Sequence, residues 1–213
     1  MQVNAVTPIT GKVIVLDAGH GGPDSGARSP NGSFEKHISL TIALKLQRLL
    51  TEAGAHVYLT RWDDNDLATA EDQRLGRRHQ RDLRNRTRRV VDRQPDAFVS
   101  IHCNSVPSPL WRGAHTIYME GNPEGERLAK LVQERFRTML LPTHRSADDM
   151  STLYLLKRIQ GPAVLAEVGF LSNPDEAHHL LQSDYQENVA TAIYMGVLDY
   201  FTHTPVQPEP TEG

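Results

Sequence analysis

The chain has 213 residues, a formal charge of −3, 38% hydrophobic residues and 23% charged residues. This length suits one domain with a sizeable core, and the composition excludes wholesale disorder. The slightly acidic balance argues against a protein built mainly to bind nucleic acid. Cys103 is the single cysteine. An internal disulfide and a zinc site of several thiolates are therefore excluded, and histidine and carboxylate would have to hold any metal.

The two ends of the chain carry little that would fold or insert into a membrane. No stretch approaches the roughly 18 apolar residues that a membrane span needs. Residues 1–10 have neither the basic start nor the apolar run of a signal peptide. A cytoplasmic protein and a trimmed form of an exported protein both fit this pattern. Residues 204–213 are rich in proline and glutamate, and we predict that they form a disordered tail.

Strand-like and helix-like runs alternate along the rest of the chain. In chain order we expect a strand at Val13–Leu16, a helix at Phe34–Ala53, a strand at His56–Thr60, a helix at Glu71–Arg93, strands at Ala97–His102 and His115–Glu120, a helix at Gly125–Leu141, a strand at Ala163–Phe170 and a helix at Asp184–Phe201. This alternation predicts an α/β fold, with one domain and a mostly parallel, twisted sheet covered by helices on both faces.

The predicted helix Glu71–Arg93 is unusually rich in arginine. Acidic residues offset part of its charge, and Leu75, Leu83 and Val90 give it a narrow apolar stripe. Such a run is typical of a solvated helix face. A basic face would also suit an anionic polymer, although it lacks the interleaved aromatic residues of a nucleic-acid site.

Ionisable residues lie where the predicted strands end, which is where open α/β sheets place their sites. His20 follows the first strand and His102 ends a later one. Glu167 is embedded in a buried strand, where an unpaired carboxylate is costly. Glu35 begins the helix after the first strand, at the same edge of the sheet.

These four residues have the chemistry of a catalytic zinc site. Two histidines and a carboxylate leave a fourth position for water, and a second glutamate would take the proton from that water. The intervals between them are long, so an ordinary set of hydrogen-bonded polar side chains remains open as the alternative. In that interpretation, Glu35 is only a favourable charge in the first turn of a helix.

Two other motifs in this region do not lead to a function. The glycine-rich turn Gly19–Gly26 resembles a phosphate-binding loop, but Asp24 stands where a dinucleotide loop needs its third glycine. Ala27 and Arg28 replace the Lys-Ser/Thr pair of a P-loop. Cys103 lies next to His102, but strand neighbours point to opposite faces, so the two are poorly placed as a nucleophile and its base.

Several separated segments resemble, in order, the zinc-dependent N-acetylmuramoyl-L-alanine amidases. They are VIVLDAGHGGPDSGA at residues 13–27, Glu35-Lys36, Thr60-Arg61, FVSIHCNS at residues 98–105 and LAEVGFLSN at residues 165–173. The resemblance extends from about Gly11 to Tyr200. Within the family, the segments YLLK and QGPAVLAEVGFLSNP and the ending YQENVATAIYMGVLDY are most similar to the germination-specific type, which acts on spore cortex peptidoglycan.

The resemblance implies a role for each matching residue. His20, Glu35 and His102 would hold one Zn²⁺, Glu167 would be the catalytic glutamate, and Asn104 would lie beside the ligands or the substrate. Residues 11–203 would form the catalytic domain. Its reaction would be hydrolysis, by zinc-activated water, of the amide between the lactyl group of N-acetylmuramic acid and the L-alanine of the stem peptide.

The resemblance also implies an exported protein that acts in the cell wall or spore cortex, with its signal or anchor segment missing here. Peptidoglycan would be its substrate and an accessory lipoprotein a candidate partner, and no nucleic acid or membrane span is expected. Two alternatives remain: a zinc peptidase that cuts within the stem peptide, and a wall-binding module without catalysis.

Overall fold

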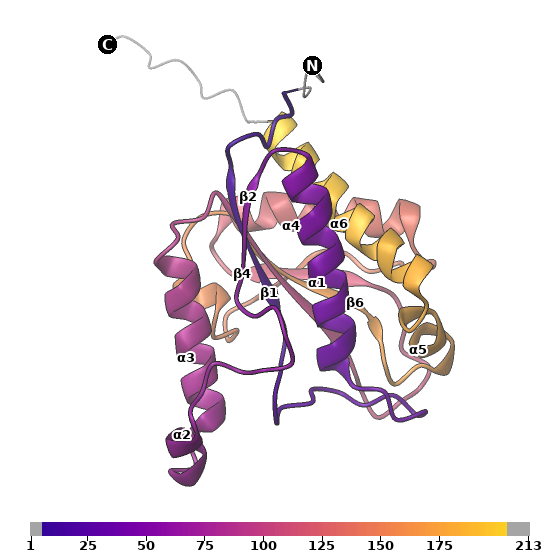
Figure 1. The fold of residues 1–213 in the computed structure, drawn as a ribbon. Helices are drawn as coiled ribbons and strands as arrows, with labels where there is room; N and C mark the ends of the chain where they lie inside the picture. Colours follow the sequence, from indigo (N-terminus) through magenta and orange to yellow (C-terminus); the bar gives the residue numbers. More distant parts are fainter. Residues whose placement is uncertain (1–5, 204–213) are drawn as a thin grey trace.

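A computed structural model describes residues 6–203, and the predicted tail at 204–213 lies outside the described residues. Six strands form one sheet in the order β2-β1-β3-β6-β4-β5 (Figure 1). The strands are β1 Val13–Ala18, β2 His56–Leu59, β3 Ala97–Asn104, β4 His115–Met119, β5 Asp148–Met150 and β6 Ala163–Phe170. All neighbours pair in parallel except β4 and β6, which are antiparallel. The mostly parallel α/β sheet expected from the sequence is confirmed.

Helices cover both faces of this sheet unequally. They are α1 Glu35–Glu52, α2 Ala70–Arg74, α3 Arg78–Val91, α4 Pro123–Met139, α5 Pro174–Leu180 and α6 Ser183–Thr202, with one 3₁₀ turn, η1, at Leu156–Arg158. Figure 1 shows α2 and α3 standing apart from α1, α5 and α6. The larger core lies under α1, α4 and α6, and the smaller one lies under α3 and η1.

Strand β1 contributes side chains to both hydrophobic cores. Ile14 and Leu16 pack in the larger core, whereas Val15 packs in the smaller one. Successive side chains of a strand point to opposite faces, so a continuous apolar run is the pattern required of a strand that is buried on both sides. The parallel strands β1 and β3 also end at the same edge of the sheet, which brings the residues that follow them together.

The single helix predicted at Glu71–Arg93 is wrong, because the structure has two helices there. Gly76 separates α2 from α3 with a φ of +64°, a left-handed conformation that glycine adopts without steric cost. The solvated arginine face is also wrong at one position, since Arg86 is only 2% exposed. The apolar stripe fails at Leu75, which is 54% exposed.

Three short elements were absent from the sequence-based prediction, namely β5, η1 and α5. Each has only 3 to 7 residues, too few to establish a hydrophobic period. Among the described residues, no helix combines the length and apolar character needed to cross a membrane.

Candidate metal centre and active site

Three of the predicted site residues meet at the edge where β1 and β3 end. His20 lies two residues beyond β1, Glu35 is the first residue of α1, and His102 lies near the end of β3. One ligand atom from each lies within 4.8 Å of the other two. The two imidazole rings face each other edge-on, with centroids 5.0 Å apart. The structure therefore brings together residues that are widely separated in the sequence.

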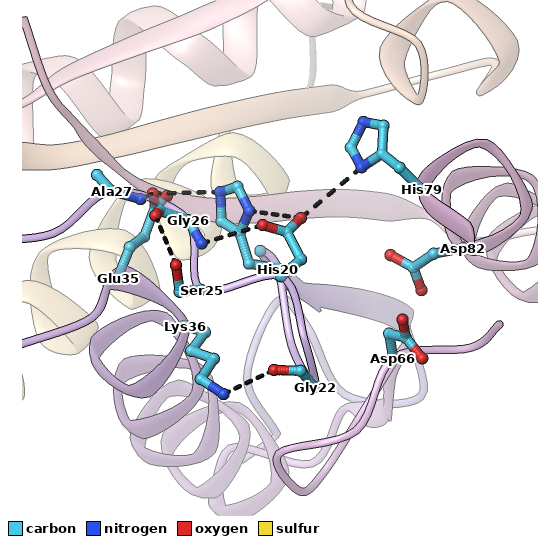
Figure 2. Close-up of polar contacts among 12 residues, drawn as sticks. His20, Gly22, Ser25, Gly26, Ala27, Glu35, Lys36, Asp66, His79 and Asp82 are labelled. Carbon is cyan, nitrogen blue, oxygen red and sulfur yellow. Dashed lines mark hydrogen bonds and ion pairs between the residues drawn. The ribbon is translucent and has the colours of Figure 1, made fainter. Parts of the chain in front are cut away.

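The Glu35 carboxylate faces His20 (Figure 2), and its two oxygens contact one histidine each, His20 and His102. Its Oε1 is 2.9 Å from His102 Nδ1, and its Oε2 is 3.2 Å from His20 Nε2. Two backbone amides also donate to it, Cys103 N to Oε1 at 2.9 Å and Ala27 N to Oε2 at 2.8 Å. The other imidazole nitrogen of His20, Nδ1, is 2.9 Å from Asp24 Oδ2. Glu35 is thus held by backbone donors on both oxygens while it faces both rings.

Two glycines make room for this arrangement. A Cβ on Gly19 would lie 2.3 Å from His102 Cε1. A Cβ on Gly26 would lie 2.6 Å from both Glu35 Oε2 and His20 Cδ2, and Gly26 has a φ of +63°. Contacts this short do not occur, so the glycine-rich turn that failed as a phosphate loop has another purpose: its missing side chains let the backbone approach the three polar groups.

The charges of these groups shift their pKa values in opposite directions. Burial favours neutral His20, but hydrogen bonds to Asp24 and Glu35 outweigh it and raise the pKa of His20 to about 10. Burial would raise the pKa of Glu35, but hydrogen bonds from His102 and His20 hold it well below its usual range. Without a metal, the cluster is therefore a carboxylate compensated by imidazolium charge.

The donor set fits zinc. Imidazole nitrogen and carboxylate oxygen are ordinary zinc ligands, and three protein ligands are the number that a catalytic site uses. Their close approach around a partly exposed position suits a cation that also binds water. Asp24 adds a feature typical of such sites, because a carboxylate on the second nitrogen of a ligating histidine fixes the orientation of its ring.

Glu167 lies on β6, directly across from His102 in the parallel β3–β6 register. Its Oε2 is buried and has no hydrogen-bond partner among the described residues. Burial, with a smaller contribution from the nearby Glu35 charge, raises its pKa to about 7 despite the opposing effect of His102. A carboxylate with a free acceptor oxygen and a pKa near neutrality has the properties of a general base.

Asn104 and Cys103 follow His102 on β3. Asn104 is half-buried, and its pairing with Phe170 comes after an irregularity in the β3–β6 register. Cys103 points the opposite way, into the larger core, where burial raises the pKa of its thiol well above the usual value. A buried thiol that stays protonated is a poor nucleophile, which supports the sequence-based argument against a cysteine hydrolase.

A cavity of about 210 Å³ opens beside the two histidines. His20 and His102 line it, and so do Leu83 of α3 and the largely apolar segment 153–156. Asp17, Arg86 and Ser100 lie at its buried polar part. The cavity thus combines polar groups that could bind a cation with apolar lining, as ligand sites commonly do.

Sequence reasoning missed three residues that the structure brings to this site. Asp24 was considered only as a departure from a nucleotide motif, and Arg86 only as part of a charged helix. Asp17 accepts hydrogen bonds from Thr60 and Ser100 within the sheet. A signal for Asp17 was available, since a carboxylate inside a buried strand is as costly there as it is at Glu167.

Comparison with known proteins identifies the family. The family model described as N-acetylmuramoyl-L-alanine amidase matches residues 14–199. The chain belongs to the N-acetylmuramoyl-L-alanine amidase family. Zinc dependence is general to this family. The family, fold class and enzyme class expected from the sequence are confirmed.

Three relatives illustrate the match. The germination-specific N-acetylmuramoyl-L-alanine amidase of Bacillus subtilis is 41% identical over 202 residues, which cover 95% of this chain and 85% of that protein. The CwlD amidase of Clostridioides difficile, in complex with the GerS lipoprotein, has a TM-score of 0.88 and 37% identity, covering 91% of this chain and 100% of that one. The catalytic domain of CwlV, an amidase of Bacillus (Paenibacillus) polymyxa, has a TM-score of 0.77 and 31% identity, covering 91% and 99%.

Proposed function

We propose that this amidase cleaves the bond between the lactyl group of N-acetylmuramic acid and L-alanine in spore cortex peptidoglycan. His20, Glu35 and His102 hold one Zn²⁺, Glu167 is the catalytic base, and residues 11–203 form the catalytic domain. The observation that carries the proposal is the convergence of three ligand atoms within 4.8 Å, beside a buried carboxylate whose Oε2 is unpartnered among the described residues. The germination-specific relative supports the choice of substrate.

Glu167 moves the proton in this reaction. When bound, zinc supplies a Lewis acid that acidifies a water and polarises the amide carbonyl. Glu167 takes a proton from that water as its oxygen attacks the carbonyl carbon. It then delivers the proton to the alanine nitrogen, and the C–N bond breaks to leave a carboxylic acid and a free amine. Asp24 and the backbone amides of Ala27 and Cys103 keep the ligands oriented throughout.

The cavity beside the histidines is the proposed substrate site. Its apolar wall at Leu153–Leu156 suits the methyl groups that flank the scissile amide, on the lactyl side and on the alanine side. Asn104, half-buried beyond His102, is proposed to lie beside the substrate or the ligands.

The test is a Glu167→Gln variant incubated with purified cortex peptidoglycan. We expect it to keep its zinc and to lose the release of lactyl carboxylates and alanine amines. Glu134→Gln, an exposed carboxyl on α4, is the matched control and should keep full activity. Unchanged activity in Glu167→Gln would refute the catalytic role. His20→Ala should lose the metal, and full metal content in that variant would refute the ligand set.

Mass spectrometry of the wild-type products separates the alternatives. Intact stem peptides that start with a free L-alanine amine support the amidase. Fragments cut within the stem peptide would identify a zinc peptidase instead. Zinc-loaded protein that binds peptidoglycan and releases no product would identify a wall-binding module.

The proposed place of action is outside the cytoplasm, in the cell wall or spore cortex, and an accessory lipoprotein is a proposed partner. The support comes from the relatives, one named for germination and another solved in complex with the GerS lipoprotein. Size-exclusion chromatography of this chain with the corresponding lipoprotein of its own organism tests the partnership. Elution of two separate species at micromolar concentrations would contradict it.

A further inference from the structure

Two buried arginines converge on the short backbone segment that joins β1 to His20. Arg61 follows β2 and is 1% exposed, and Arg86 lies on α3 and is 2% exposed. Neither is within the proposed ligand set. Arginine is almost never fully buried unless its donors are satisfied, so the partners of these two side chains indicate what they do.

Arg61 binds a backbone carbonyl next to each of two proposed ligands, His20 and Glu35. Its Nε donates to Ala18 O at 2.8 Å, and its Nη2 donates to Gly19 O at 2.8 Å and to Lys36 O at 2.7 Å. Gly19 directly precedes His20, and Lys36 directly follows Glu35. A single guanidinium therefore ties the segment that carries one ligand to the first turn of the helix that carries another.

Arg86 holds the same segment from the opposite helix. Its Nη1 donates to Ala18 O at 2.7 Å and its Nη2 donates to the carbonyl of His20 itself. Its charge is compensated by Asp17 Oδ1 at 2.9 Å and by Asp82 Oδ2 at 2.7 Å. Together, the two arginines bind three consecutive carbonyls, those of residues 18, 19 and 20.

The backbone of His20 needs such support. Its φ is +61°, in the left-handed region that a residue with a Cβ rarely adopts. Strain of this kind persists only where the surroundings impose it. The neighbouring Gly19 also donates its N–H to Ile101 O, next to His102, at 3.0 Å. The backbone of residues 18–20 is thus the common link between the three segments that carry His20, Glu35 and His102.

We propose that Arg61 and Arg86 are positioning residues. Through hydrogen bonds to the carbonyls of residues 18–20 and 36, they hold His20 and Glu35 in the positions needed to bind the metal. The proposal rests on the metal role of His20 and Glu35 given above. It explains how Arg61, in the Thr60-Arg61 motif, can contribute to the site although it is far from the proposed ligands in sequence. It also explains why one arginine of the charged helix is buried while Arg84 and Arg88 remain exposed.

The forked shape of the guanidinium matters here as much as its charge. Arginine offers five N–H donors in a fixed plane, whereas lysine offers one compact ammonium that cannot reach carbonyls on two sides. Arg61→Lys and Arg86→Lys therefore keep the charge but lose the simultaneous hydrogen bonds to several carbonyls. Ser39→Ala is a milder perturbation, since it removes one donor, at 2.9 Å, from the Gly19 carbonyl.

The experiment measures zinc affinity by chelator competition, the visible absorption of the Co²⁺ form, and the Tm of the metal-free protein. We expect Arg61→Lys and Arg86→Lys to weaken zinc binding by about 10- to 100-fold, as loss of a partner that orients a ligand typically does, and to alter the Co²⁺ bands. Ser39→Ala should weaken binding by about two- to tenfold, the range of one neutral hydrogen bond.

Two controls separate positioning from general stability. Val132→Ala creates a space in the core between α4 and α6, two helices that carry none of the proposed ligands, so it should lower the Tm and leave zinc affinity unchanged. Arg84→Met removes an exposed charge from α3 and should change neither. Lysine variants that bind zinc as tightly as the wild type, or a Val132→Ala that loses zinc equally, would overturn the proposal. If the lysine variants do not fold, unchanged affinity and Co²⁺ bands in Ser39→Ala overturn it.

The same measurements distinguish this inference from the proposed function. Wild-type protein that binds no zinc would overturn both. Wild-type protein that binds zinc, with lysine variants of equal affinity, would overturn the positioning role alone.

Discussion

Replacing Gly26 by alanine is the sharpest test of how the glycine-rich turn serves the metal centre. The new Cβ would lie 2.6 Å from Glu35 Oε2 and from His20 Cδ2, so at least one of these two side chains has to move. The backbone strain is added to this, because Gly26 has a φ of +63°. A left-handed conformation costs a residue with a Cβ about 1–2 kcal/mol.

Gly76 provides a matched control. Its φ is +64°, nearly the same as that of Gly26, but its Cβ would meet no heavy atom of the described residues within 4 Å. Gly76→Ala should therefore cost only the backbone strain, about 1–2 kcal/mol, and each kcal/mol lowers the Tm of a chain of this length by about 2–4 °C. The difference in Tm and zinc affinity between Gly26→Ala and Gly76→Ala therefore reports the steric contact with Glu35 and His20 alone.

The assay compares Tm and zinc affinity for the two variants. Gly26→Ala should lose at least as much stability as Gly76→Ala and should bind zinc about 10- to 100-fold more weakly, because a displaced ligand no longer meets the other two. Gly76→Ala should keep wild-type zinc affinity. Wild-type affinity in Gly26→Ala would refute the steric argument, and so would an equal loss of affinity in both variants.

Two further predictions concern Asp17 and Cys103. Burial would raise the pKa of Asp17, but Arg86 and two hydroxyl donors lower it to about 2, so its stabilising effect is present above pH 4 and is lost between pH 4 and pH 2. Wild-type protein should therefore lose about 2 kcal/mol more than Asp17→Asn over this range in urea titrations, and equal losses would contradict the assignment. Cys103→Ser should keep most of its amidase activity, because the thiol is buried in the larger core and its pKa is raised, and a drop of about 100-fold would support a cysteine nucleophile after all.

The sheet and the convergence of His20, Glu35 and His102 could be predicted from the sequence for one physical reason. A strand buried on both faces has to be apolar, so polar residues such as Glu167 stand out within it. Parallel strands then bring their carboxyl ends to one edge, which explains why His20 and His102 meet there. The parallel topology predicts that these residues are close in space, which the long intervals between them in the sequence do not.

The break at Gly76 and the burial of Arg86 were not accessible in the same way. A glycine inside a charged helical pattern is compatible with a continuous helix, and only the packing of α3 against the sheet decides which arginine turns inward. Arg86 differs from its neighbours in what it faces, namely Asp17 and the carbonyls of Ala18 and His20, and none of these is close to it in sequence. Local pattern cannot report a partner that is 66 to 69 residues away.

The hydrogen-bonding groups around Glu35 find partners among themselves, and this determines what a bound metal would contribute. Glu35 is held by hydrogen bonds from the backbone amides of Ala27 and Cys103. Hydrogen bonds to Asp24 and Glu35 raise the pKa of His20 to about 10, so we expect metal binding at this ring to release a proton. Because the two hydrophobic cores are built from other residues, we expect a bound metal to supply chemistry to a folded protein and not to create the fold.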